Sequence, residues 1–161
     1  MQPCKRFGLI GEADFLTNCL LQELQVAQPL GKYDPYDRLV GKLRPCWRVQ
    51  VKTSGNLSRH KAYHVGLARR PRKRGVRCTA VYTPQEIDFF AIYLVPEDTW
   101  YIVPIEITDG RLVNIQAHDH PKRGPWLPYL EAWHLLAQTG DRIVLPERLS
   151  RVAGGRPFQG F

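Results

Sequence analysis

Two apolar runs, EIDFFAIYLV at residues 86–95 and TWYIVPIEI at residues 99–107, constrain the fold of this chain most. Both are rich in β-branched and aromatic residues, which are typical of strands. The turn Pro-Glu-Asp separates them, so the pair predicts a β-hairpin. Together with two strands expected earlier in the chain, this hairpin predicts a core sheet of at least four strands.

The earlier strands also form a predicted hairpin. A short strand is expected at Tyr36–Val40, and a Gly-Lys turn leads from it into the strand CWRVQVKTS, residues 46–54. In the second strand, three apolar residues alternate with three polar ones: Trp47, Val49 and Val51 against Arg48, Gln50 and Lys52. Gln50 and Lys52 must therefore share a face of the sheet.

Helices are expected near both ends of the chain. From Gly8 to Ala27, apolar residues recur at helical spacing, namely Leu9, Ala13, Leu16, Leu20 and Leu24, and Pro29 and Gly31 follow as terminators. After Pro128, a second amphipathic pattern is expected to form a helix that stops near Gly140. We expect one α/β domain over residues 1–161, a mixed and largely antiparallel sheet flanked by these helices, with a flexible Gly-rich tail from about residue 151.

The formal net charge of +8 originates in one segment. Eight basic residues lie there: Arg59, Lys61, Arg69, Arg70, Arg72, Lys73, Arg74 and Arg77. The rest of the chain has 15 of the 23 Lys and Arg residues, which equals the number of Asp and Glu residues. Such a run is often only a solvated surface. Because this one follows a strand that carries Gln50 and Lys52, we interpret it as a nucleic-acid-binding segment.

Location and thiol chemistry are less informative. No apolar run approaches the ~20 residues that span a bilayer, and charge interrupts the N-terminus before a signal-peptide core could form, so we expect a cytoplasmic protein.

The four cysteines, Cys4, Cys19, Cys46 and Cys78, form no Cys-x-x-Cys pair. We expect them to be free thiols, buried or half-buried.

Three places along the chain are candidates for a catalytic site: Glu12, Asp37 and the segment Gln50-Val51-Lys52. Glu12 shares the helical stripe of Leu16 and Leu20, which predicts an inward-facing carboxylate, although a charge that merely complements the helix dipole is an equal reading. Asp37 stands at a strand entry, where Asp is often only a turn former. The segment Gln50-Val51-Lys52 places two polar side chains on one face, as solvent-facing strands also do.

The succession IGEADFL, DPYDRLV, WRVQVKT, a basic stretch, Tyr82, IDFFAIY, WYIVPIE and YLEAW resembles the PD-(D/E)XK nuclease superfamily. It is most similar to the branch that includes group I intron-associated homing endonucleases. The resemblance covers roughly residues 8 to 136. Gln50 departs from the commonest pattern, which has an acid at this position, and the intron-associated branch carries the same substitution.

The resemblance implies a restriction-endonuclease-like fold and a Mg²⁺- or Mn²⁺-dependent endonuclease that hydrolyses phosphodiester bonds of double-stranded DNA. Its implied catalytic residues are Glu12, Asp37, Gln50 and Lys52. The metal ligands would be Asp37, Gln50, the main-chain carbonyl of Val51, and Glu12. Cleavage of both strands requires two active sites, so a homodimer or homotetramer is expected, with the Trp- and Tyr-containing C-terminal region as a candidate interface.

Other readings stay open from the sequence. A nuclease fold that only binds DNA would be expected to lose the Asp or the Lys, and both are present. A Holliday junction resolvase or restriction-type nuclease would differ in substrate shape and oligomeric state. An RNA-binding basic protein would use exposed aromatics, which here fall in core-like runs. His60, His64, His118 and His120 lack the spacing of a metal site.

Overall fold

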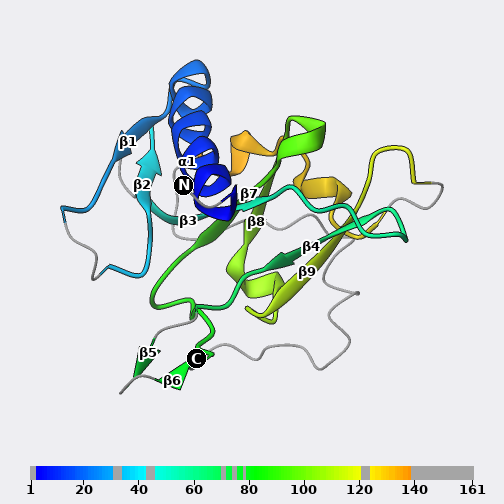
Figure 1. Cartoon of the computed structure of the whole chain (residues 1–161). Coiled ribbons are helices and arrows are strands. Elements are labelled where there is room, and N and C mark those ends of the chain that lie inside the picture. The colour runs from blue at the N-terminus through cyan, green and yellow to red at the C-terminus, as the bar shows by residue number, and fades with distance from the viewer. Residues whose placement is uncertain are drawn as a thin grey trace, which may run out of the picture.

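The computed structural model describes residues 3–30, 34–42, 46–69, 72–73, 76–77, 79–120 and 124–138, with backbone alone at 3–4, 72–73 and 76–77. Its centre is a five-stranded sheet in the order β1-β2-β3-β7-β8 (Figure 1). These strands are Gln25–Ala27, Arg38–Gly41, Trp47–Ser54, Phe89–Leu94 and Thr99–Pro104. Only β3 and β7 pair in parallel, which confirms the expected mixed, largely antiparallel sheet.

The expected hairpin of the two apolar runs is confirmed as β7 and β8, whose residues are all buried. A short 3-10 turn, η1 (Val95–Glu97), joins the strands. On one side, an aromatic cluster covers the hairpin: the rings of Phe15, Trp100 and Trp133 lie 5.4 to 5.7 Å apart. Such contacts add to the apolar area that each ring buries and place the core on β7 and β8.

The first helix, α1, spans Pro3–Leu21 rather than Gly8–Ala27. Proline is compatible with a first helical turn, since its missing N–H would have no intrahelical partner there. At the other end, Glu23 takes a left-handed φ of 56°, which ends the helix. Residues 25–27 then pair with β2 as the edge strand β1, so tertiary pairing overrides the helical spacing of Leu24.

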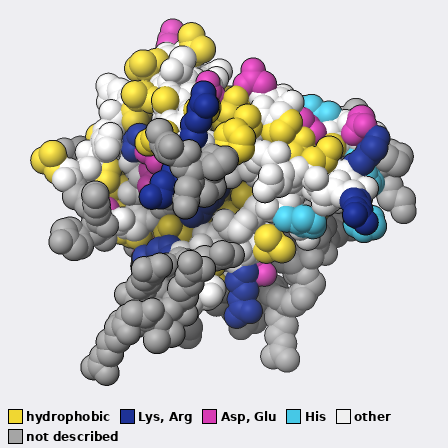
Figure 2. Space-filling view, viewed as in Figure 1, with side chains coloured by type: hydrophobic (Ala, Val, Ile, Leu, Met, Phe, Trp, Pro, Cys, Tyr) yellow, Lys and Arg dark blue, Asp and Glu magenta, His cyan; other side chains and the backbone are white. Residues whose placement is uncertain are grey.

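The buried stripe of α1 also differs from the expected one. Leu9, Leu16 and Leu20 are 56%, 41% and 65% exposed, whereas Gly11, Phe15 and Cys19 are buried. Figure 2 shows hydrophobic side chains on the surface of this helix. The cause is close packing on β3, since a Cβ at Gly11 would lie 2.1 Å from the Thr53 Oγ1 atom. A bulkier stripe could not approach the sheet this closely.

Two pairs of strands outside the main sheet were not expected. β4 (Ala62–Gly66) and β9 (Leu112–Gln116) form an antiparallel ribbon. Tyr63 and Val113 belong to its buried face, while His64 and Asn114 lie on the exposed one and are joined by a 2.5 Å hydrogen bond. A short ladder of β5 (Arg72–Lys73) and β6 (Val76–Arg77) follows β4. The basic segment therefore contains strands.

The expected C-terminal helix is wrong within the described residues. Two 3-10 turns, η3 (Leu127–Tyr129) and η4 (Trp133–Leu135), stand in its place. Glu131 separates them with a φ of 47°, and its carboxylate accepts hydrogen bonds from the main-chain N–H of Trp100 and the indole of Trp133, each at 2.7 Å. These contacts with the sheet outweigh continuation of a helix. Gly140 and the Gly-rich tail lie outside the described residues.

Two smaller expectations also need correction. Tyr129 and Trp133 are buried in the core, so this part of the C-terminal region cannot supply an exposed aromatic interface. Cys19 is a buried free thiol, as expected, and burial raises its pKa to about 12. Cys46 is free but exposed, because it precedes β3 at the sheet margin. The side chains of Cys4 and Cys78 lie outside the described part of the chain.

Candidate active site

Asp37 lies immediately before β2, against the middle of β3. Its main-chain N–H donates to the Val49 carbonyl at 2.9 Å, which continues the β2–β3 ladder by one residue. Its Oδ2 atom accepts hydrogen bonds from the main-chain N–H of Val51 at 2.8 Å and from the Gln50 amide. The carboxylate is thus held on the strand that carries the predicted Gln-x-Lys pair.

The Gln50 amide faces two oxygens at once. Its Nε2 atom donates to Asp37 Oδ2 and also lies 3.4 Å from the Val51 carbonyl oxygen. A carboxylate and a carbonyl oxygen that converge on one point form the hard-oxygen environment that divalent cations prefer. A half-turn of the amide about its terminal bond would add the Gln50 Oε1 atom to this set. The donor set therefore fits a hard divalent cation.

Side-chain clusters of the usual ligand types do not occur here. Within the described ranges, His, Cys, Asp and Glu do not gather in groups of three or more that could hold a metal ion. At Asp37 such a group is missing because its neighbours are of other kinds. Gln50 stands where a carboxylate is commonest, and Val51 offers its main-chain carbonyl oxygen. A metal on this face would depend on amide and carbonyl oxygens.

Glu12 faces the site from α1. Its carboxylate lies 3.5 Å from Arg38 Nη2, and its side chain is 40% exposed. Arg38 also donates through Nη1 to the main-chain carbonyl of Asp37 at 2.7 Å. Glu12 does not lie on a buried leucine stripe, as expected from the sequence, because Leu16 and Leu20 are exposed, yet its carboxylate reaches this neighbourhood. Sequence reasoning missed Arg38, whose only signal was its position directly after Asp37.

Burial favours the neutral forms of both Asp37 and Lys52. Desolvation raises the pKa of Asp37, and Glu12 raises it further, while the Val51 hydrogen bond and the nearby Lys52 and Arg38 act in the opposite direction. Burial also lowers the pKa of Lys52, an effect that Asp37 opposes and Arg69 increases. Both shifts follow from removing charged groups from water, and a bound cation would favour the ionised carboxylate.

The basic residues lie in different places. Arg59 and Lys61 are exposed in the loop before β4. Figure 2 shows Lys, Arg and His side chains together at the end of the molecule where this loop lies in Figure 1. Lys61 pairs with Asp119 at 2.5 Å. Arg69 is half-buried beside Tyr82. Arg72, Lys73 and Arg77 belong to the β5–β6 ladder, and Arg70 and Arg74 lie outside the described residues.

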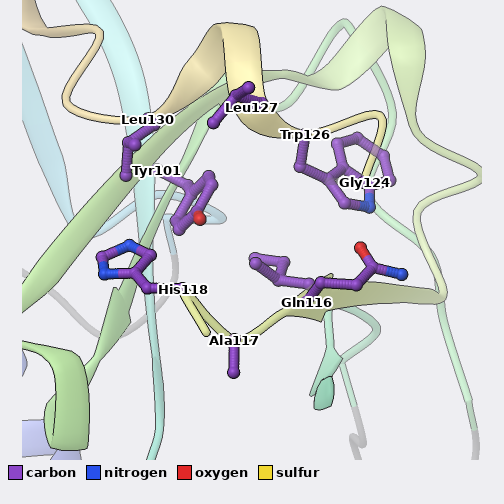
Figure 3. A pocket seen from close by; sticks show the side chains of 9 residues that line it. Tyr101, Gln116, Ala117, His118, Gly124, Trp126, Leu127 and Leu130 are labelled. Carbon is purple, nitrogen blue, oxygen red and sulfur yellow. The ribbon is translucent and has the colours of Figure 1, made fainter. Parts of the chain in front are cut away.

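A cavity of about 210 Å³ lies elsewhere, between β8, the end of β9 and residues 124–130. Figure 3 shows Tyr101, Gln116 and Trp126 around it. Its lining includes none of Glu12, Asp37, Gln50 and Lys52. The cavity therefore lies apart from the cluster around Asp37.

A mixed sheet with a helix packed on β3, an Asp entering β2 and a Gln-x-Lys pair on β3 together define a nuclease core of the restriction-endonuclease type. Residues 2–136 match the sequence model of the PD-(D/E)XK endonuclease family, and the chain belongs to this family. It is a nuclease, as the resemblance implied.

A solved structure of a bacterial homing endonuclease, I-Ssp6803I, is similar to this chain. The two share 25% sequence identity with a TM-score of 0.73, and the match covers 83% of this chain and 93% of the other. No curated protein matches the chain. Among the residues described, no helix is long and apolar enough to cross a membrane.

Proposed function

We propose that this nuclease is a magnesium-dependent DNA endonuclease whose biological role is that of a homing endonuclease. The observation that carries the proposal is the convergence of the Asp37 carboxylate and the Val51 carbonyl on one point, with Lys52 on the same strand. PD-(D/E)XK endonucleases generally use divalent metal ions. The similarity to a homing endonuclease supports the biological role.

In this proposal, Asp37, the Val51 carbonyl and the turned Gln50 amide hold Mg²⁺ or Mn²⁺, and Glu12 orients its water shell. The bound ion supplies polarisation of the scissile phosphate and a more acidic water. Lys52 orients the attacking water and offsets negative charge that develops on the phosphate. An amide in place of a carboxylate keeps an oxygen ligand but removes one charge, so we expect weaker metal binding than a site with two carboxylates would have.

Double-stranded DNA is the proposed partner. The basic segment from Arg59 to Arg77 would neutralise phosphates and position the duplex. Cutting both strands needs two active sites, so we propose a homodimer or homotetramer, in the cytoplasm where DNA is accessible. A monomer that cut both strands in a single encounter, measured by sedimentation together with cleavage kinetics, would count against this assembly.

The decisive experiment is cleavage of supercoiled plasmid with and without Mg²⁺, at low and moderate salt. We expect the natural chain to nick or linearise the plasmid. Asp37→Ala and Lys52→Ala should bind DNA but lower the cleavage rate by at least about 100-fold, since each removes a group that acts on the reacting phosphate. Glu23→Gln changes an exposed carboxylate in the turn after α1 and serves as the matched control.

Several outcomes would contradict the assignment. Cleavage by the Asp37→Ala protein would remove Asp37 from the site. Binding without cutting, on plasmid and on a broad DNA library at every metal concentration tested, would favour a nuclease fold that serves binding only. Preference for branched over linear DNA would instead indicate a junction resolvase, and protection of one short palindrome by methylation would indicate a restriction-type role.

A further inference from the structure

Two cationic side chains, those of Lys52 and Arg69, lie over the ring of Tyr82. The Nζ atom of Lys52 lies 5.2 Å from the ring centroid, and the Cζ atom of Arg69 lies 4.7 Å from it. Both distances are within the range of cation–π attraction. The ring itself is buried and meets Phe90 of β7 edge-on, with centroids 5.6 Å apart. Tyr82, which packs against the core sheet, thus holds Arg69 next to Lys52, the proposed catalytic lysine.

Arg69 is also fixed at its backbone and at its guanidinium. Its main chain pairs with Ala80 in both directions, at 2.8 and 3.0 Å. Its Nη2 atom donates to Glu86 Oε1 at 2.6 Å. Glu86 is itself oriented, because its Oε2 atom accepts a hydrogen bond from the main-chain N–H of Thr83 at 3.0 Å. The side chain of Arg69 therefore has little freedom left to lose when it binds an anion.

One donor of this guanidinium has no partner. The Nε atom of Arg69 is buried, and it has no hydrogen bond among the residues that the structure describes. A buried N–H without an acceptor costs stability, about 1 to 3 kcal/mol. The side chain as a whole is 34% exposed, so an anion can approach it. The exposed part of this guanidinium lies over the same ring as the Lys52 amine, so both cations can face one phosphate group.

Electrostatics support the same neighbourhood. Asp37 and Arg69 both lie close enough to act on the Tyr82 hydroxyl: burial and Asp37 raise its pKa, Arg69 opposes the rise, and the pKa reaches about 12. Two cations on one ring repel each other, and Glu86 and Asp37 offset this repulsion only in part, through Arg69 and Lys52 respectively. An anion between Lys52 and Arg69 would relieve this repulsion.

We propose that Arg69 is a further catalytic residue, a second cation that contacts the non-bridging oxygens of the scissile phosphodiester beside Lys52. Tyr82 and Glu86 are then positioning residues. The inference rests on the proposed function. In the hydrolysis, the oxygen of water bonds to phosphorus, and the bond to the leaving sugar oxygen breaks. The water gives up a proton and the leaving oxygen gains one, so negative charge rises on the oxygens that Arg69 would face.

The competing explanation is that Arg69 has a structural role only: its ion pair with Glu86 would attach residue 69 to the turn at residues 83–86. Single-turnover cleavage at saturating protein separates the two readings. We expect Arg69→Gln to lower the rate about 100-fold, which is typical for loss of one transition-state donor, and to lower DNA affinity far less, as expected for loss of one phosphate contact. Arg69→Lys should recover part of the rate, because it keeps the charge but loses the planar fork. Arg111→Gln changes an exposed arginine outside this cluster and is the matched control.

A comparison with Glu86→Gln gives a readout that a joining role would not produce. Arg69→Gln and Glu86→Gln both remove the Arg69–Glu86 ion pair, but Glu86→Gln leaves the positive charge of Arg69 in place. The single-turnover rate of Glu86→Gln should therefore fall much less than that of Arg69→Gln. If Arg69→Gln folds poorly because Glu86 is left unpaired, the double variant Arg69→Gln/Glu86→Gln removes both charges and repeats the test.

The outcomes are distinguishable. A natural chain that cuts, an inactive Asp37→Ala protein and an Arg69→Gln protein at the natural rate would overturn this inference and leave the proposed function intact. The same holds if the rate of Glu86→Gln falls as far as that of Arg69→Gln. A natural chain that never cuts would overturn both. A slower Arg69→Gln protein, partly recovered in Arg69→Lys while Glu86→Gln keeps most of the natural rate, supports the inference.

Discussion

At the scale of single residues, Gln50 determines how this site differs from one with two carboxylates. Its amide occupies the point where the Asp37 and Val51 oxygens converge, and its N–H group there satisfies both acceptors. Binding a cation would exchange these hydrogen bonds for coordination. The exchange costs the amide two acceptors, so the metal affinity of the natural chain should be modest.

Replacing this amide tests its role directly. Gln50→Glu adds a second carboxylate beside Asp37, and we expect Mg²⁺ to bind on the order of tenfold more tightly, because ligand charge sets affinity at such sites. Without metal, the two like charges should raise the pKa of Asp37 further and destabilise the fold at neutral pH. As the pH falls through that raised pKa, Asp37 gains a proton and the destabilisation should disappear.

Metal titration by calorimetry measures the first effect, and denaturant unfolding with and without Mg²⁺ measures the second. Gln85→Glu adds the same charge at an exposed position before Glu86 and is the control. Equal Mg²⁺ affinity in the Gln50→Glu and natural proteins would remove Gln50 from the ligand set.

At the scale of elements, the contact between α1 and β3 positions the two carboxylates relative to each other. Gly11 is buried against Thr53, one residue after Lys52, and Glu12 follows it on the helix. A change in the distance between helix and strand therefore also moves Glu12 away from Asp37. Stability and the geometry of the site depend on the same contact.

Gly11→Ala is expected to destabilise the protein by about 1 to 3 kcal/mol, because the added Cβ would overlap Thr53 and force helix and strand apart. Gly8→Ala on the same helix has open space and should be neutral or stabilising by up to about 1 kcal/mol. The double variant Gly11→Ala/Thr53→Ala removes the overlapping atoms and should recover part of the loss. Denaturant unfolding measures all three, and an undisturbed Gly11→Ala protein would contradict this packing.

At the scale of the whole molecule, the positive charge is unevenly distributed. The basic segment carries the entire excess of +8, and its exposed members Arg59 and Lys61 lie in the loop before the β4–β9 ribbon. Asp119 pairs with Lys61 at 2.5 Å, and both side chains are largely exposed, so the pair adds little stability. It does, however, compete with a phosphate for Lys61.

Salt dependence of DNA binding measures this charge. Arg59→Gln should reduce the slope of log affinity against log salt by about one, as expected for the loss of one phosphate contact. Asp119→Asn should have the opposite effect on affinity, with binding a few-fold tighter at low salt, because it frees Lys61 and removes a repulsive charge. Fluorescence anisotropy on one duplex over a range of salt suffices. An Arg59→Gln slope equal to that of the natural chain would exclude this loop from the interface.

Local alternation was sufficient to predict the core of the sheet and the face that Gln50 and Lys52 share, because side chains of a strand point to alternate sides whatever surrounds them. The β7–β8 hairpin followed from apolar runs of strand length around a turn. The approach of Asp37 to this face followed from the resemblance to a nuclease family, and the hydrogen bonds to Val51 and Gln50 now support it. Its catalytic role stays a prediction.

The sequence alone could determine whatever depends on neighbours along the chain: strand alternation, turns, and the charge of the basic segment. The tertiary structure alone decided which side of α1 is buried, because a glycine permits closer packing than the leucines that dominate the pattern. It also replaced the second helix with two turns held by Glu131, brought Tyr82 and Arg69 next to Lys52, and paired Arg69 with Glu86. These outcomes depend on contacts between residues far apart in the chain, and no local periodicity encodes them.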